Sequence, residues 1–309
     1  MVTRVTTPGN YSAVLANLLN AQRSQMEAGD RVSTRKNGQN LKDYARSSEL
    51  LTAMRSVQTR LGVYEEQNKV LSDKLATQDT AITRVADAAQ AVRQLFSEAL
   101  ASGRADTLVE DVEGQLRNAV EGMNARYGGK YLFAGGQVDT RPVTATTLAD
   151  LTAGPTIASF FKNDDFKVTA KIDEATTVTT GLQADDMGTA ILTAFQAFQA
   201  FNQGPTGNFT GQLTAAQQTF LEGQLSSWDD ARGDVTQMAA YNGVNQRRLD
   251  TVAEDVKSRQ NSLAGMIGDI TDADVAEAAS QLQQAQLAVQ SAAYVFQSLQ
   301  DSSLINLLR

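Results

Sequence analysis

Hydrophobic residues recur every seven positions along two long stretches of the chain. The first stretch carries two such columns, which are Met54, Leu61, Asn68, Leu75, Ile82, Ala89 and Phe96, and Leu50, Val57, Tyr64, Leu71, Gln78, Val85, Val92 and Ala99. The second carries Trp228, Val235, Asn242, Leu249, Val256, Leu263 and Ile270, followed by Val275, Leu282, Val289 and Phe296. Such repeats are typical of α-helices that pack as coiled coils. Their amide members, Asn68, Gln78 and Asn242, are expected to fix the register of the helices.

The prolines leave room for long helices. They are Pro8, Pro142, Pro155 and Pro205, so the blocks 9–141 and 206–309 contain none. Proline breaks a helix interior because it lacks a backbone donor and clashes with the preceding turn. A helix over 44–101 would be on the order of 85 Å long, whereas a compact chain of this length is roughly 50 Å across. We therefore expect a mainly α fold in which both chain ends form an elongated antiparallel coiled-coil rod.

The middle of the chain, residues 136–222, has a different texture and is rich in Thr and Gly. FKVTAKI at 166–172 alternates apolar and polar residues, which predicts a strand, and TTVTT at 176–180 is a candidate partner. Apolar residues from Met187 to Phe201 recur at helical spacing until the breaker run at 202–208. We expect a small α+β outer domain inserted here.

These patterns divide the chain into three predicted parts. Residues 1–43 with 271–309 would be terminal assembly helices, 44–135 with 223–270 the helical rod, and 136–222 the outer domain.

Both ends carry helices outside the rod. Residues 278–300 contain no charge, which suits close packing against other helices better than a solvated surface. Near the N-terminus, Tyr11, Val14 and Leu18 recur at helical spacing, and a loop is expected at 29–38. The two helices could pair within one chain. We favour assembly helices that are completed by neighbouring copies and disordered in the monomer.

Composition excludes several chemistries. The formal net charge is −8, so a nucleic-acid partner is not expected, and the chain has no cysteine and no histidine. We therefore expect no thiol chemistry, zinc site, cofactor or enzymatic activity. The start lacks a secretory signal peptide and no 18-residue apolar run occurs, so no membrane partner is expected and composition alone favours a cytoplasmic protein.

Two acidic residues near the last helix invite a metal-site interpretation. Asp272 and Asp274 lack a third acidic ligand at loop spacing, which makes a poor calcium site. We expect instead that both cap the last helix, where carboxylates meet unpaired N–H groups.

Several segments resemble the bacterial flagellin family. They are DITDAD at 269–274 with the Gln/Ala-rich helix and the LLR end, DRVSTR at 30–35, and AQAVRQL at 89–95. YGGKYLFAG at 127–135 and TRPV at 140–143 are most similar to the hook-associated branch, at the hook–filament junction. The chain departs from the family at 41–44, where LKDY replaces the usual acidic pair.

The resemblance implies a structural adaptor that joins hook to filament outside the cell. Such proteins are exported unfolded by the flagellar type III apparatus, without a cleaved signal. The implied partners are other copies of the chain, another hook-associated protein, flagellin, and an export chaperone at the C-terminal helix. The expected assembly interface is Tyr11, Val14, Leu18, Arg93, Leu95, Leu282, Val289, Phe296, Leu304, Leu307 and Leu308.

Two alternatives remain open from the sequence. A filament-forming flagellin would share both ends but act as a bulk polymer. A signalling coiled coil would carry ordinary charges on its last helix and a membrane anchor, and the sequence shows neither.

Overall fold

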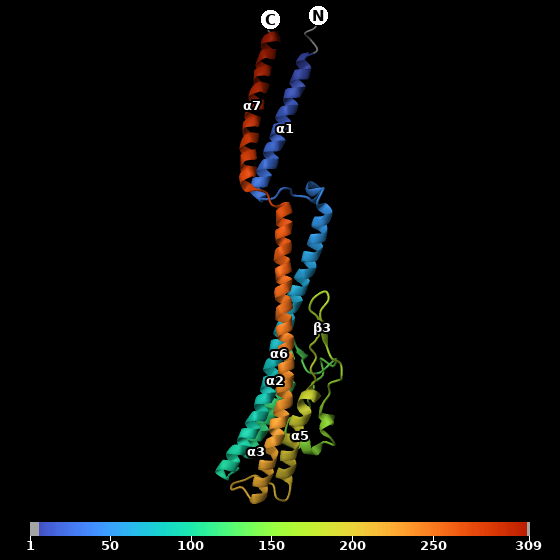
Figure 1. Ribbon diagram of the computed structural model, residues 1–309, viewed down its shortest axis with the longest axis vertical. Helices are drawn as coiled ribbons and strands as arrows, with labels where there is room; N and C mark the ends of the chain where they lie inside the picture. The colour runs from blue at the N-terminus through green and yellow to red at the C-terminus, as the bar shows by residue number, and fades with distance from the viewer. Residues whose placement is uncertain (1–5, 308–309) are drawn as a thin grey trace. The chain divides into compact units, whose positions relative to one another are not determined.

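The computed structural model describes residues 6–307, with side chains over 11–300. Over this range the chain forms seven α-helices, two short 3-10 helices and two small antiparallel strand pairs (Figure 1). The mainly α fold predicted from the sequence is confirmed. The chain divides into two compact units, unit 1 (1–61 and 258–309) and unit 2 (62–257). The predicted three-part division stays a prediction.

Unit 1 contains the antiparallel pair of α1 (Thr6–Thr34) and α7 (Val275–Leu307). The Tyr11 and Phe296 rings lie 5.1 Å apart, and Arg31 Nη1 donates to Gln281 Oε1 at 3.2 Å, which sets the opposed directions. Each helix fills the apolar seam of the other, which is the arrangement expected if the two helices pair within one chain. The pair also lengthens α1 at its C-terminal end.

The loop predicted at 29–38 is wrong in its first half, because α1 continues to Thr34. Ala28 is buried, and a Cβ on Gly29 would lie 3.9 Å from Leu282 Cδ1, so this turn packs closely on α7. The chain leaves the helix at Arg35, whose φ is +56°. The short helix η1 (Leu41–Tyr44) follows.

The two longest helices, α2 (Ser48–Ser102) and α6 (Ala215–Thr271), pass through both units. Within unit 2 they run antiparallel, since Arg93 pairs with Asp229 and Asn242 donates to the Leu75 carbonyl at 3.0 Å. Of the two predicted columns on α2, the one from Met54 to Phe96 faces inward along most of its length. The other fails at its start, where Leu50 is 51% exposed and Leu51 is buried instead.

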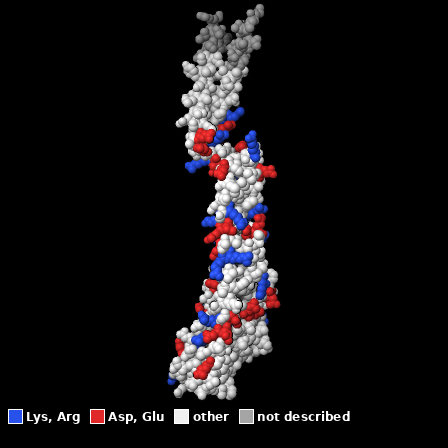
Figure 2. Space-filling model, viewed as in Figure 1, with Lys and Arg blue, Asp and Glu red and all other residues white. Residues whose placement is uncertain are grey.

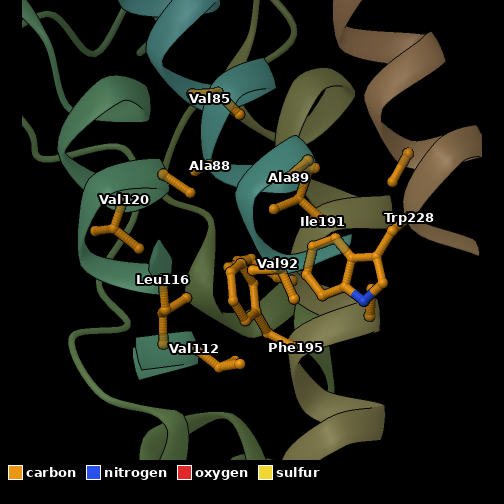
Figure 3. Packing of buried hydrophobic residues seen from close by; sticks show 14 of the residues in the cluster. Val85, Ala88, Ala89, Val92, Val112, Leu116, Val120, Ile191, Phe195 and Trp228 are labelled. Atoms are coloured by element: carbon orange, nitrogen blue, oxygen red, sulfur yellow. The ribbon is translucent and has the colours of Figure 1, made fainter. Parts of the chain in front are cut away.

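The main core of unit 2 lies where α2 and α6 meet α3 (Leu108–Met123) and α5 (Ala184–Gln203). Figure 3 shows side chains from all four helices converging. Trp228 packs edge-on to Phe195, with ring centroids 4.8 Å apart, and Phe96 lies against both Trp228 and Phe198. The phenylalanines of α5 are therefore core residues.

Short elements fill the remainder of the inserted segment. They are β1 (Arg126–Tyr127) paired with β2 (Lys130–Tyr131), α4 (Leu148–Ala153), η2 (Ile157–Phe160), and β3 (Thr169–Lys171) paired with β4 (Thr177–Thr179). The strands at 166–172 and 176–180 are shorter than predicted. Phe166 lies before β3 begins and is 61% exposed, and its backbone N–H donates to Asp164 Oδ1 at 3.1 Å.

Candidate assembly surface

The inner seam of the α1–α7 pair has a regular spacing. We define it by the buried and half-buried residues Val14, Leu18, Ala21, Gln25 and Ala28 of α1, and Ala278, Leu282, Ala285, Val289, Ala292, Phe296 and Leu299 of α7. The spacing of three and four residues is that of a coiled-coil seam. Small alanines lie between larger residues along this seam, which lets the two helices approach closely.

Two long segments of the pair carry no charge, whereas the end of the pair next to the linker residues carries Glu27, Arg31 and Glu277. Residues 5–22 and 278–300 contain no Lys, Arg, Asp or Glu. Figure 2 shows no charged residue over most of the described part of the pair, whereas charges of both signs cover other parts of the molecule. A solvated helix pair normally carries charges on its outer faces.

Large apolar side chains lie on these outer faces. Leu15, Leu19 and Met26 of α1 are 38%, 53% and 65% exposed. On α7, Leu287 and Tyr294 follow each other at seven residues and are 63% and 77% exposed. Each helix thus carries a second row of apolar residues, beside the row that contacts the other helix. We call Leu15, Leu19 and Met26 of α1, together with Leu287 and Tyr294 of α7, the outer stripe.

Exposed apolar residues concentrate in unit 1. It holds twelve of the seventeen large hydrophobic residues that are exposed in the described part of the chain, although it is the smaller unit. An exposed apolar patch marks an interaction site more reliably than scattered single residues do. Unit 1 is therefore the candidate assembly surface.

A set of hydrogen bonds joins the two segments that lead into the pair. Asn37 N–H donates to the Thr271 carbonyl at 2.8 Å, and Ala273 N–H donates to the Arg35 carbonyl at 3.0 Å. The Asn37 side chain donates to the Asp272 carbonyl at 2.8 Å. We call residues 35–37 and 271–273 the linker clasp. It ties the end of α1 to the start of α7 within unit 1.

The acidic residues near α7 take different roles. Asp274 Oδ1 accepts the N–H groups of Ala276 and Glu277, at 2.9 and 3.1 Å, as an N-cap does. The cap role expected for Asp272 needs correction, because its carboxylate contacts Lys36 and Thr271 in the linker clasp. The Lys36 ammonium holds the pKa of Asp272 below its ordinary value.

The predicted interface residues fall into separate groups. Val14, Leu18, Leu282, Val289 and Phe296 line the inner seam and are half-buried by the pairing of α1 with α7. Tyr11 stacks beside Phe296 and remains 41% exposed.

The predicted residues Leu304, Leu307 and Leu308 cannot be assigned to the inner seam or to the outer stripe. Leu304 and Leu307 belong to the backbone of α7, but their side chains lie outside the described ones. Leu308 lies outside the described residues altogether.

Arg93 and Leu95 belong to unit 2. Arg93 Nε lies 2.6 Å from Asp229 Oδ1 on α6, as an ion pair within the chain. Leu95 is half-buried against the main core. Both are thus engaged within the monomer, where they support the packing of α2 on its neighbours.

The prediction missed the outer stripe, above all Met26, Leu287 and Tyr294. The signal was present in the sequence as a second apolar row on each helix. If each helix is expected to have one apolar seam, a second apolar row is interpreted as ordinary surface. Beside Leu287 and Tyr294, the absence of charges distinguishes this row from ordinary surface.

Over the described residues, no group of three or more Asp or Glu side chains is placed to hold a metal ion. A search of the described helices for a stretch able to span a bilayer finds none.

Comparison with solved structures identifies similar folds. A protein from Vibrio parahaemolyticus described as a flagellar hook-associated protein matches with a TM-score of 0.61 at 16% identity, over 74% of this chain and 100% of its own. FlgL of Bacillus cereus matches with a TM-score of 0.55 at 12% identity, over 71% of this chain and 99% of its own. A search of curated proteins finds no match.

Both end regions of the chain match models of one protein family. The bacterial flagellin N-terminal helical region matches residues 5–137, and the bacterial flagellin C-terminal helical region matches residues 225–308. The two matches cover the whole of α1 and of α7, the helix pair of unit 1, and together they span more than half of the chain. This protein therefore belongs to the bacterial flagellin family and is a structural component of the flagellum.

Proposed function

We propose that this protein is the adaptor that joins the flagellar hook to the filament. The observation that carries the proposal is the outer stripe, which remains exposed after α1 and α7 have paired and lies mostly on the uncharged segments 5–22 and 278–300. The fold similarity to proteins described as a hook-associated protein and as FlgL supports the adaptor over other roles in the family.

Assembly would proceed by burial of the outer stripe against neighbouring copies. Each square ångström of apolar surface removed from water contributes roughly 25 cal/mol. Three large residues of α1 and three of α7 (Leu287, Tyr294 and Val295) are available. Since the inner seam is already closed, neighbours need only dock on a formed surface and the ordering cost is small.

The proposed partners are other copies of the chain, a second hook-associated protein and flagellin. We also propose an export chaperone at α7, because an outer stripe exposed before assembly needs cover. Export would be unfolded and without a cleaved signal, and a chain without cysteine suits that route since no disulfide can form beforehand.

The outer stripe is tested by Leu287→Ser and Tyr294→Ser, with Gln283→Ser as the matched control on an exposed polar position of the same helix. We expect both stripe variants to keep the helical content of the monomer and to raise the critical concentration for assembly at least tenfold. The control should assemble normally. Unchanged assembly of the stripe variants would remove the basis of the proposal.

The alternative is a filament-forming flagellin, which the two family matches favour equally. Electron microscopy of the purified chain distinguishes the two. An adaptor should form no long filament alone, should add to the ends of hook fragments, and should then accept flagellin. Long filaments grown from this chain alone would establish the alternative.

A further inference from the structure

The β3–β4 hairpin has a core of its own. Ile172 and Val178 are buried with Leu75 of α2 and Leu249 of α6 in a cluster that is separate from the main core. Leu249 lies 14 positions along α6 from Val235, the nearest buried main-core residue of that helix, or about 21 Å of helix. Figure 1 shows the hairpin beside α6 at a distance from α5 and α3. The hairpin therefore touches the helices at a second, independent place.

Side-chain amides dock the hairpin. Asn68 Nδ2 donates to the Ile172 carbonyl at 2.9 Å, Gln78 Nε2 donates to the Thr180 carbonyl at 3.2 Å, and Asn245 Nδ2 donates to the Thr179 carbonyl at 2.9 Å. Tyr241 Oη also donates to the Thr179 carbonyl, at 3.2 Å.

The register role expected for Asn68 and Gln78 therefore needs correction. Both hydrogen-bond to the hairpin, whereas Asn242 is the one of the three heptad amides that reaches across the helix pair, to the Leu75 carbonyl. The heptad amides of α2 thus mark the position where a third element joins the helix pair.

Docking of the hairpin on α2 and α6 has a cost in free energy. Within the described residues, Asn68 Oδ1 and Gln78 Oε1 are buried and accept no hydrogen bond from another protein group. A buried polar atom without a partner has lost its hydrogen bonds to water and has gained none within the protein. Release of the hairpin would return both oxygens to water, at the expense of the small apolar cluster.

We propose that residues 168–180 form a strap, which opens from α2 and α6 while the main core stays folded. Three features make separate opening possible: an independent cluster of four buried side chains, docking through side-chain amides, and two unpaired amide oxygens. The closed strap holds the two helices together at Leu75 and Leu249. The open strap leaves that level of the helix pair free to bend or twist.

Hydrogen exchange of the full-length protein tests the strap. The Thr180 amide, which donates to the Val168 carbonyl at 2.8 Å, and the other paired hairpin amides should exchange at least 100-fold faster than amides of α2 and α5 in the main core. Ile172→Ala should accelerate the hairpin amides a further fivefold or more and leave the main core unchanged. Thr169→Ala, on an exposed position of the same hairpin, is the control.

The proposal is overturned if hairpin and main-core amides exchange at one rate and accelerate together in Ile172→Ala, since the strap would then open only by global unfolding. If that variant does not fold, the wild-type protein decides. Exchange of the hairpin amides that is insensitive to low urea indicates local opening. A urea dependence equal to that of the main core contradicts it.

Discussion

The contact between Gly135 and Asp164 shows how single residues set the turn that closes the base of the inserted segment. Gly135 has a φ of +66°, and Asp164 Oδ1 accepts the Gly136 N–H at 2.7 Å. A Cβ at Gly135 would overlap the Asp164 carboxylate and lie 2.6 Å from its carbonyl oxygen. Both the backbone conformation and the space therefore require glycine.

Gly135→Ala should lower the free energy of unfolding by roughly 2–4 kcal/mol, as left-handed strain and overpacking add. Gly128→Ala is the control, because its φ is +56° but nothing lies within 4 Å of the added Cβ. It should cost about 1–2 kcal/mol. Urea unfolding measures both, and equal effects would show that the Asp164 contact does not matter.

Several aspartates set the pH range of stability. Backbone N–H groups hold the pKa of Asp150 and of Asp164 below the ordinary value, through Thr146 and Gly136 respectively, and the Lys36 ammonium does so for Asp272. A carboxylate whose pKa is lowered by folding stabilises the fold above its unfolded pKa. That contribution is lost as pH falls through the folded pKa.

We therefore expect the urea midpoint to be flat between about pH 5 and 8, where the chain has no histidine to titrate, and to fall below about pH 4. Asp150→Asn should make the acid limb shallower, because one of the titrating groups is gone. A midpoint that changes steeply near pH 6.5 would contradict this account.

At the scale of elements, the seven-residue pattern predicted the long helices well because it records which face each helix buries. It missed α3, although Leu108, Val112, Leu116 and Met123 are buried on one face. That helix is too short for a heptad search and shows instead a spacing of three to four. The docking partners of Asn68 and Gln78 could not be predicted, since each lies more than a hundred residues away in sequence.

The inner seam of α1 and α7 should tolerate no charge. Ala285 is 8% exposed, so Ala285→Glu would bury a carboxylate between the helices and should melt the pair. Circular dichroism should lose helix from up to the 29 residues of α1 and the 33 of α7. Gln283→Glu, on the exposed face, is the control.

The only tryptophan of the chain, Trp228, reports on unit 2 in the same experiment. Its fluorescence should be unchanged in Ala285→Glu, because the main core does not involve α7. Loss of both signals together would show that the two units unfold as one.

At the scale of the whole molecule, exposed apolar residues concentrate in unit 1, which also contains the two long uncharged segments. Because residues 5–22 and 278–300 carry no charge, assembly through them should depend little on ionic strength. We expect the critical concentration to change less than about twofold between 0.05 and 0.5 M NaCl. It should fall on warming from 5 to 25 °C, because the stabilisation from apolar burial is weaker in the cold. Light scattering measures both, and dissociation by moderate salt would point to charged contacts instead.

The pairing of α1 with α7 also sets an order of events in the life of the chain. About 240 residues separate Thr34 from Val275, and synthesis at 5–20 residues per second places α7 roughly 10–50 s behind α1. During that interval α1 cannot pair with α7, so its apolar face is free to bind another protein with an apolar groove. The delay leaves a window in which a carrier could hold the nascent polypeptide open, before closure of so long a loop commits it to its final shape.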